Sequence, residues 1–370
     1  MSDATDATNT PDDVERLLEA LTNAPGPVGF EGPVRAIVRE ALAHVASAIE
    51  TDGLGSLVVR LDGAAERPRI MLSAHMDELG LLVRRITPEG YLTFQTLGGW
   101  LDQALVNQRW IVLTSNGPVP GVTGIKTVHV MTPEARNRVF PRDELFIDVG
   151  ASNAEDATTR LGIRPGDPVV PDSRFVPLAG GRLYLAKAWD DRVGVGVMIE
   201  VLRALSAQPH PNTVYGVATV QEEVGLRGAE TSAHLVSPEI GINLESGVAG
   251  DYPGITADEA QERLGQGPAI FLHDSSMLPN LRLRDLCIEV AREIEVPLQF
   301  NVLSGYGQDG AAMQRTGSGI PAINIVVPTR YLHSHNGVIQ RDDFDRTVRL
   351  VTALVQRLDA ETVARVRAFD

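Results

Sequence analysis

The distribution of hydrophobic positions divides the chain into two kinds of sequence. Over residues 12–77 and 178–370, apolar β-branched runs alternate with segments whose hydrophobic residues recur at the spacing of a helix face. Residues 78–177 consist instead of short Val, Ile and Leu runs broken by Gly, Pro and Asn, which is typical of an all-β unit. We therefore predict an α/β fold, with a split three-layer α/β domain, a mixed central sheet and an inserted all-β domain.

Individual elements follow from the period and from the residues that flank each run. Thr10 is expected to cap a first helix that ends before Pro25, and residues 1–11 form a polar, acidic segment that we expect to be a mobile tail. Further helices are expected at residues 32–44, 154–161, 190–205, 281–294 and 343–358. Strands are expected at residues 54–61, 69–74, 213–220, 240–244, 298–303 and 320–327.

Composition narrows the possible partners and compartment. The chain has 370 residues, 43% of them hydrophobic, which is enough for a large core. Its formal net charge of −15 disfavours nucleic-acid phosphates and anionic lipids as partners. The single cysteine, Cys287, cannot form an internal disulfide, and neither a leader nor an apolar run of about 18 residues occurs. We expect a cytoplasmic protein that binds no nucleic acid and no membrane, with Cys287 as a small core residue.

Acidic and histidine residues stand where the expected strands end or helices begin. They are His75 with Asp77, Asp190, Glu222 with Glu223, Glu245, and His333 with His335. Because parallel strands end on the same side of a sheet, these groups are able to converge. Crowded carboxylates must be neutralised or must bind a cation, and a pair of divalent metal ions meets this need. Nitrogen and carboxylate ligands without thiolate indicate zinc, with cobalt or manganese as alternatives.

Two local spacings add chemical detail. In His75-Met76-Asp77 the carboxylate is able to accept the second N–H of a metal-bound imidazole and so fix its orientation. Glu222 and Glu223 follow an expected strand, and consecutive side chains of an extended chain point to opposite sides, so one is free to bind metal while the other faces substrate. Taken singly, each of these residues is more often a solvated charge or a structural histidine.

Five stretches occur together in one order: SAHMDELGLLV, AKAWDDRVGVGV, VQEEVGLRGAE, VAGDYPG and PTRYLHSHN. This motif set resembles that of the TET-type aminopeptidases, dinuclear-metal exopeptidases of the glutamyl and leucyl kind that are sometimes labelled cellulases. The resemblance extends over nearly the whole chain and includes GIRPGDPVV and GQGPAI. It implies hydrolysis of short peptides from the N-terminus and two divalent metal ions per subunit. It also implies a homo-oligomer in which the inserted domain makes dimers and dimers form a tetrahedral dodecamer.

The resemblance also assigns metal ligands. Asp190 would bridge the two metal ions, His75 and Glu245 would complete one site, and Glu223 and His333 would complete the other.

The same resemblance gives Glu222 and Asp77 catalytic roles. Glu222 would be the general base that takes a proton from a bridging water or hydroxide and later returns it to the leaving amine. Asp77 would be the supporting partner of His75.

Three positions depart from the family pattern. Glu245 stands where the family usually has Asp, and its longer arm has the potential to shift one metal ion. Tyr252 stands where Thr is usual. His335 stands where Pro or another residue is more common, and we expect it to be a partly exposed loop residue rather than a metal or substrate contact.

Other interpretations of the sequence are weaker. Gly305 to Gly310 match G-x-G-x-x-G, the pattern of a dinucleotide-binding loop, but the helix after them is too short and the ribose-binding acid is missing. By resemblance to the same family, we instead interpret Asp309 in this loop as support for the metal site. A glycoside hydrolase would use the paired carboxylates as acid and base, yet it has no need of His75 and His333. A non-catalytic metal-binding assembly protein would have no need of Glu222.

Overall fold

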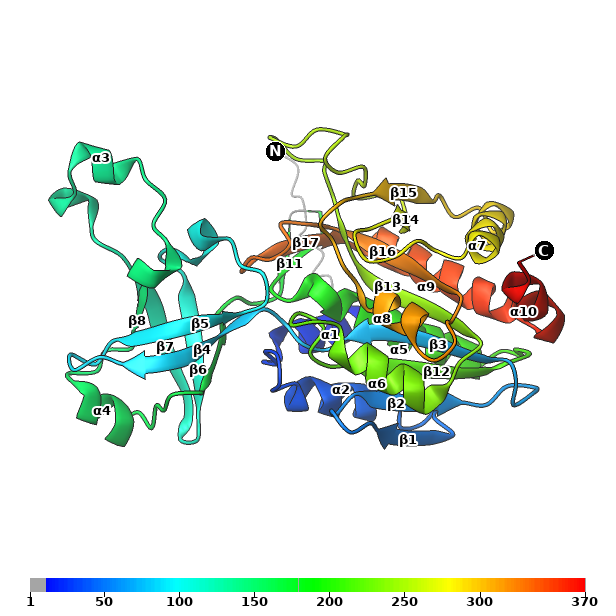
Figure 1. Cartoon of the computed structure of the whole chain (residues 1–370), viewed down its shortest axis with the longest axis horizontal. Coiled ribbons are helices and arrows are strands. Elements are labelled where there is room, and N and C mark those ends of the chain that lie inside the picture. The colour runs from blue at the N-terminus through cyan, green and yellow to red at the C-terminus, as the bar shows by residue number, and fades with distance from the viewer. Residues whose placement is uncertain (1–10, 179, 370) are drawn as a thin grey trace, which may run out of the picture.

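The computed structural model describes residues 11–178 and 180–369 and has two bodies, a large sheet-and-helix body and a small barrel (Figure 1). Thr10 and residues 1–10 of the expected tail lie outside the described residues. None of the described helices combines the length and hydrophobicity needed to cross a membrane.

The large body is built on one mixed sheet of eleven strands. Its main path runs β1 (Ala48–Thr51), β2 (Leu57–Leu61), β12 (Thr213–Thr219), β3 (Arg69–His75), β13 (Ile240–Val248), β16 (Ala322–Arg330), β17 (Gly337–Gln340), β11 (Leu183–Ala186) and β10 (Val176–Pro177). Strand β14 (Ala269–His273) pairs with β16 and with β15 (Gln299–Val302). The four central strands β12, β3, β13 and β16 are parallel, so their carboxyl ends share one edge of the sheet.

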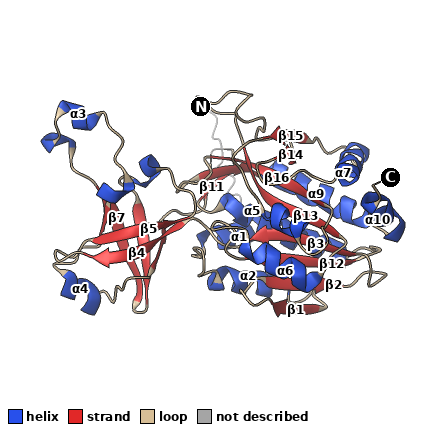
Figure 2. Cartoon of the chain, viewed as in Figure 1, coloured by secondary structure: helices blue, strands red, loops and turns tan. Residues whose placement is uncertain are grey.

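Helices cover both faces of this sheet, so the α/β body has three layers (Figure 2). One face packs on α1 (Asp13–Asn23), α2 (Gly32–Leu42), α5 (Trp189–Ser206), α7 (Leu281–Glu293), α9 (Arg341–Arg357) and α10 (Ala360–Arg367). The other face packs on α6 (Arg227–Val236) and α8 (Asp309–Arg315). In β3, Ile70 and Leu72 enter the first core while Met71 enters the second, as the two-residue period of a strand requires. A strand that is buried on both faces therefore has a continuous run of apolar residues in its sequence.

The small body is a closed antiparallel barrel with its own hydrophobic core. Its strands are β4 (Gly80–Ile86), β5 (Leu92–Leu97), β8 (Phe146–Asp148), β7 (Gly117–Gly124), β6 (Arg109–Thr114) and β9 (Pro168–Pro171), in spatial order. The short helices α3 (Pro133–Arg136) and α4 (Ala154–Thr159) lie at its far side from the large body (Figure 1). This arrangement confirms the predicted mixed α/β fold with a separate β unit, while the residue limits 12–77 with 178–370 and 78–177 stay predictions.

Several local expectations were incomplete. Helix α1 is capped by Asp12, whose carboxylate accepts the backbone N–H of Glu15. Strand β2 begins only at Leu57, because residues 52–55 form a turn. Strand β13 continues to Val248, beyond the expected end at residue 244. Helix α6 and strands β14 and β17 were not predicted.

Cys287 lies in the first core on α7, as expected for a small apolar residue. Burial raises the pKa of its thiol to about 12.

Candidate metal centre and active site

The candidate site begins at His75, the last residue of β3. It pairs in register with Thr219 at the end of the parallel strand β12, so both strands deliver their next residues to the same edge of the sheet. The imidazole is 1% exposed, and its Nε2 lies 3.0 Å from Asp190 Oδ1 and 3.7 Å from Glu245 Oε1. His75 is therefore enclosed by carboxylates that come from two other elements, α5 and β13.

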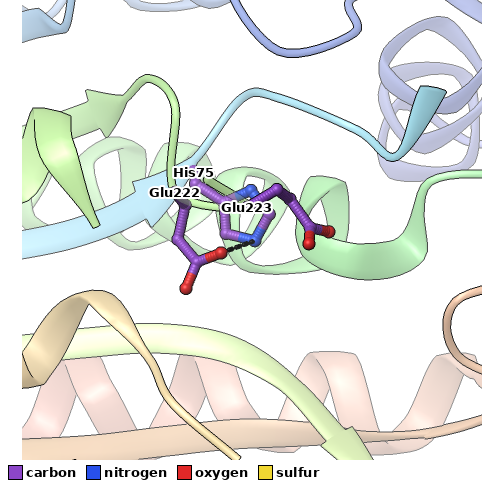
Figure 3. Close-up of side chains that lie close together, drawn as sticks. All are labelled: His75, Glu222 and Glu223. Carbon is purple, nitrogen blue, oxygen red and sulfur yellow. Dashed lines mark ion pairs between the residues drawn. The ribbon is translucent and has the colours of Figure 1, made fainter. Parts of the chain in front are cut away.

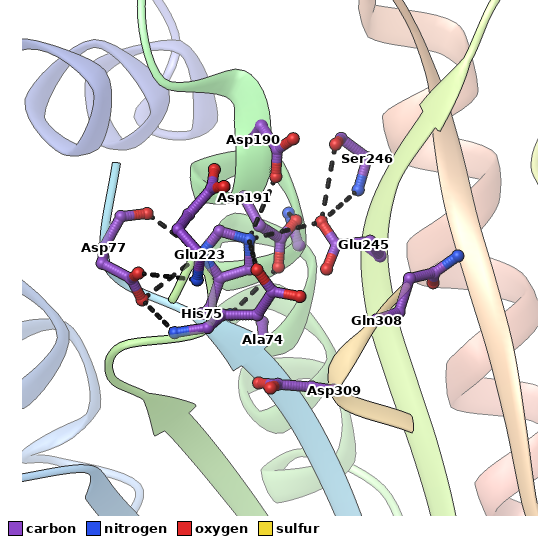
Figure 4. Close-up of polar contacts among 12 residues, drawn as sticks. Ala74, His75, Asp77, Asp190, Asp191, Glu223, Glu245, Ser246, Gln308 and Asp309 are labelled. Atoms are coloured by element: carbon purple, nitrogen blue, oxygen red, sulfur yellow. Dashed lines mark hydrogen bonds and ion pairs between the residues drawn. The ribbon is translucent and has the colours of Figure 1, made fainter. Parts of the chain in front are cut away.

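The predicted residues form overlapping triads, and Figure 4 shows the triad of His75, Asp190 and Glu245. One triad contains His75, Asp190 and Glu245, and another contains Asp190, Glu223 and His333. Within each triad the potential ligand atoms all lie within 4.8 Å of one another. Asp190 belongs to both, because its Oδ1 faces His75 and its Oδ2 lies 3.4 Å from His333 Nε2.

The paired glutamates diverge around the His75 ring (Figure 3). Glu222 Oε2 lies 3.9 Å from His75 Nε2, whereas Glu223 Oε2 lies 3.9 Å from His333 Nε2. The expectation of an extended chain at this point was wrong: Gln221 has a φ of 58°, and a turn starts at Glu223. His75, Glu222 and Glu223 also form a third group with metal-binding geometry. The arrangement alone therefore leaves Glu222 open to either role, ligand or proton acceptor.

Asp77 supports both halves of the site. His75 Nδ1 lies 3.0 Å from the backbone oxygen of Asp77 and 3.6 Å from its carboxylate. The carboxylate oxygens accept the backbone N–H groups of Glu222 at 3.0 Å and Glu223 at 3.1 Å. Asp77 thus orients the imidazole mainly through its backbone, and its side chain fixes the turn that carries the two glutamates.

Burial and mutual repulsion perturb these acids strongly. Burial raises the pKa of Glu222 and of Glu245 well above the usual range, and the neighbouring carboxylates Glu223 and Asp191 add to the respective effects. Burial, together with the charge of Asp190, raises the pKa of Glu223 to about 8. Carboxylates this crowded remain ionised only beside cations.

The two histidines respond in the opposite sense. Burial alone would lower the pKa of His75, but the charge of Glu245 and the hydrogen bond to Asp190 outweigh it and raise that pKa well above its usual value. Burial likewise opposes protonation of His333, yet the Asp190 and Glu223 carboxylates raise its pKa to about 9.

Sequence reasoning missed a buried charge cluster behind the site. The Glu78 carboxylate lies 2.6 Å from Lys187 Nζ and 3.6 Å from the Arg192 guanidinium, and it accepts the Gly26 backbone N–H. Burial lowers the pKa of Lys187 to about 8. This cluster joins the segment that carries His75 and Asp77 to the segment that carries Asp190. The adjacency of Glu78 to Asp77 was the available signal.

Asp191 was also missed. Its carboxylate accepts the backbone N–H groups of His75 and Gly194. Helix α5 begins at Trp189, within one residue of the expected start at Asp190, but Asp190 and Asp191 have non-helical backbone angles. Asp190 therefore lies on an irregular segment that turns its carboxylate towards both histidines.

An open pocket of 280 Å³ leads to the triads. Its walls are the four carboxylates Asp190, Glu222, Glu223 and Glu245, with His333, Leu226, Tyr306 and the backbone of Gly99, Gly305 and Gly307. The Tyr306 ring stacks on Phe271 at 5.4 Å, and its hydroxyl donates to the Ser246 backbone oxygen at 2.9 Å. These contacts make the Tyr306 ring a fixed wall of the pocket.

Two other predicted residues lie apart from the triads. His335 is 4% exposed and packs against Trp100 and Trp110 of the barrel, so the expectation of a partly exposed loop residue was wrong. Burial lowers the pKa of His335 to about 4, although the backbone of Arg109 favours the protonated form. Asp309 is buried and accepts a hydrogen bond from Thr219, and burial raises its pKa to about 6.

The donor set fits divalent metal ions. All the facing atoms are carboxylate oxygens or imidazole nitrogens, and in the described chain no protein donor reaches the buried Glu223 Oε1. Such an atom is costly unless something positive binds it. An α/β sheet that gathers overlapping His–carboxylate triads at the carboxyl ends of its parallel strands defines a metal-dependent hydrolase.

Comparison with known proteins narrows this class to one family. Residues 55–350 match the family model described as M42 glutamyl aminopeptidase. The chain is 32% identical to the glutamyl aminopeptidase of Lactococcus lactis subsp. cremoris, over 95% of this chain and 98% of that protein. The chain belongs to the M42 family and is a metal-dependent aminopeptidase.

Solved structures agree with this assignment. The TET aminopeptidase of the marine sediment archaeon Thaumarchaeota archaeon SCGC AB-539-E09 is 43% identical, with a TM-score of 0.93 and coverage of 95% of this chain and 98% of that one. The TET1 peptidase of Pyrococcus horikoshii, which assembles into a tetrahedron or a large octahedral shell, is 31% identical with a TM-score of 0.84. The match covers 93% of this chain and all (100%) of the Pyrococcus chain.

Proposed function

We propose that this aminopeptidase removes N-terminal residues from short peptides with Glu222 as the general acid and base. The observation that carries the proposal is the pair of triads that share Asp190, with Glu222 facing the same pocket. His75, Asp190 and Glu245 would hold one divalent metal ion, and Asp190, Glu223 and His333 a second. Bound there, zinc, cobalt or manganese would supply a Lewis acid that polarises the scissile carbonyl and acidifies water.

Glu222 is suited to move the proton. Its carboxylate lines the pocket, and burial raises its pKa well above the usual value, which favours acceptance of a proton. Its carboxylate would take a proton from the attacking water and later deliver it to the nitrogen of the leaving peptide. Asp77 would hold Glu222 in place through the backbone N–H of that residue.

The pocket walls offer no basic partner to an acidic N-terminal side chain. Leu226 and Tyr306 are its apolar and aromatic members, and no Lys or Arg side chain lines it within the described residues. An acidic N-terminal side chain would meet carboxylates without a cation from the chain to pair with. We therefore expect leucyl substrates to be cleaved faster than glutamyl ones.

A panel of aminoacyl p-nitroanilides tests both statements. EDTA-treated enzyme is assayed with leucyl, lysyl and glutamyl substrates before and after addition of zinc, cobalt or manganese. Activity that disappears with EDTA and returns with metal supports the proposal. Hydrolysis of carboxymethyl cellulose that survives EDTA would instead support a glycoside hydrolase.

We also propose that the barrel makes dimers and that dimers assemble into a tetrahedral dodecamer in the cytoplasm. The relationship to assembling TET peptidases supports this. So do the exposed apolar side chains Leu101, Val128, Val130 and Val139, which lie 50–62% exposed around the barrel. Mass photometry in metal-replete buffer would contradict the assembly by finding monomers alone.

A further inference from the structure

The loop of residues 331–336, which joins β16 to β17 and carries His333, is held by the barrel as well as by the sheet. His333 Nδ1 lies 2.6 Å from the backbone oxygen of Gly99, which follows β5. Two residues further on, His335 inserts into the barrel core. Ser173, in the segment that returns from the barrel to the sheet, donates a hydrogen bond to Asn336 at 2.8 Å.

His335 makes the most deeply buried of these attachments. Its ring centroid lies 4.3 Å from that of Trp110 and 5.6 Å from that of Trp100, with edge-to-face or tilted geometry. Both tryptophans belong to the barrel core, and Trp100 is itself fixed by donating its Nε1–H to the Gly80 backbone oxygen at 3.1 Å. Neither ring nitrogen of His335 has a hydrogen-bond partner with ordinary geometry among the described residues, although the Arg109 backbone lies near the ring and favours its protonated form. His335 therefore contributes the shape of its ring, as an aromatic residue would.

The barrel also contacts the second triad directly. A Cβ on Gly98 would lie 3.0 Å from Glu223 Oε2, and a Cβ on Gly99 would lie 3.2 Å from His333 Nδ1. A side chain at either position would crowd Glu223 or His333, so the two glycines let the barrel backbone approach both side chains closely. The first triad is supported differently, since the backbone of Asp77 orients His75 and the Ser246 backbone N–H donates to Glu245.

The loop needs such external support. Tyr331 and His333 have φ angles of 60° and 56°, in the left-handed region that is unfavourable for a residue with a side chain. The His333 side chain is 38% exposed, so part of it stays open to the pocket. An Nδ1–H bond to the Gly99 oxygen would fix the tautomer and leave Nε2 facing Asp190 and Glu223.

We propose that the barrel positions the second metal triad, with His335 as an aromatic plug between the domains that holds the loop carrying His333 in its ligating position. This inference rests on the metal assignment under the proposed function. His335 acts through His333 and is a positioning residue. Loss of such a support around a ligand lowers metal affinity about 10–100-fold, and here we expect the loss to fall on one of the two ions.

The test compares His335→Ala with His335→Phe. Zinc is titrated into metal-free enzyme against a chromophoric chelator, and the zinc content and kcat/KM are measured alongside. We expect His335→Ala to weaken the affinity of the enzyme for one zinc ion about 10–100-fold and to leave its affinity for the other ion unchanged. We expect His335→Phe to bind both ions like the wild type, because it restores a ring between the tryptophans. His44→Ala, at an exposed histidine just after α2 and outside the barrel, is the matched control and should behave like the wild type.

The outcomes separate the alternatives. If His335→Ala binds both ions with wild-type affinity, the plug does not position the site and the proposal is overturned. If the Phe variant is as impaired as the Ala variant, a ring nitrogen of His335 is needed, which also overturns it. If His335→Ala fails to fold, Gly99→Ala gives the test. Its added Cβ would displace His333 and should weaken the binding of one metal ion without changing the binding of the other. Wild-type enzyme that binds fewer than two ions would refute the metal assignment itself.

Discussion

Glu262 gives a stability prediction that does not depend on the metal site. It lies between β13 and β14 and is completely buried (0% exposed). Its Oε1 accepts a hydrogen bond from Asn301 Nδ2 at 2.6 Å, while its Oε2 has no partner among the described residues. Burial, with a smaller contribution from the charge of Asp343, raises the pKa of Glu262 from its ordinary 4.5 to about 7.

The magnitude and sign follow from linkage. Each pKa unit corresponds to about 1.4 kcal/mol, so the interval from 4.5 to about 7 corresponds to roughly 3 kcal/mol. Between these two values the folded state binds more protons than the unfolded state, and its stability therefore falls as pH rises. The contribution is fully present below the unfolded pKa and is lost once the pH exceeds the folded pKa.

Glu262→Gln removes the titration and keeps the shape of the side chain. The free energy of unfolding in urea is measured for the variant and the wild type at the same protein concentration, from about pH 5 to about pH 8. We expect the variant to gain up to about 3 kcal/mol relative to the wild type over this range, because other titrating groups cancel in the difference. Glu289→Gln, an exposed glutamate on α7, is the control. A difference that stays constant within about 0.5 kcal/mol would refute the buried-carboxyl reasoning.

Three further predictions concern the site and its support. Glu222→Gln should keep its metal content and lose at least about 100-fold in kcat; loss of metal would instead make Glu222 a ligand. Glu223→Gln should lower both metal content and kcat, measured by elemental analysis and steady-state kinetics, and an unchanged metal content would remove it from the ligand set. Glu78→Gln leaves the buried Lys187 without its carboxylate, so it should lower the free energy of unfolding by about 3–5 kcal/mol; a loss below about 1 kcal/mol would contradict this account.

Much of the fold could be predicted because its signals are local. The apolar run of β3 stops at His75 and that of β12 stops at Val220, one residue after the strand ends, so the sequence shows where the sheet edge must be. Turn-forming residues between short strands likewise predicted a separate β unit. Acidic and histidine residues just beyond such strand ends predicted most of the side chains that meet, with His335 as an exception.

The details of support could not be predicted in this way. The Asp77 carboxylate accepts N–H groups from residues about 145 positions later, and nothing in the local pattern of either segment indicates that bond. His335 has the appearance of a loop residue because its neighbours are Ser334 and Asn336, yet tertiary packing buries it in the barrel core.

By itself, the sequence determined the periods of the strands and helices, the inventory of carboxylates and imidazoles and their places at element ends. These depend on backbone geometry over a few residues. Only the tertiary structure decided that one carboxylate serves two triads, that Glu222 and Glu223 diverge at a turn, and that the barrel contacts the His333 loop. Those features arise from surfaces brought together by burial of the whole sheet, and a hydrophobic pattern specifies that a face is buried without specifying which distant side chain covers it.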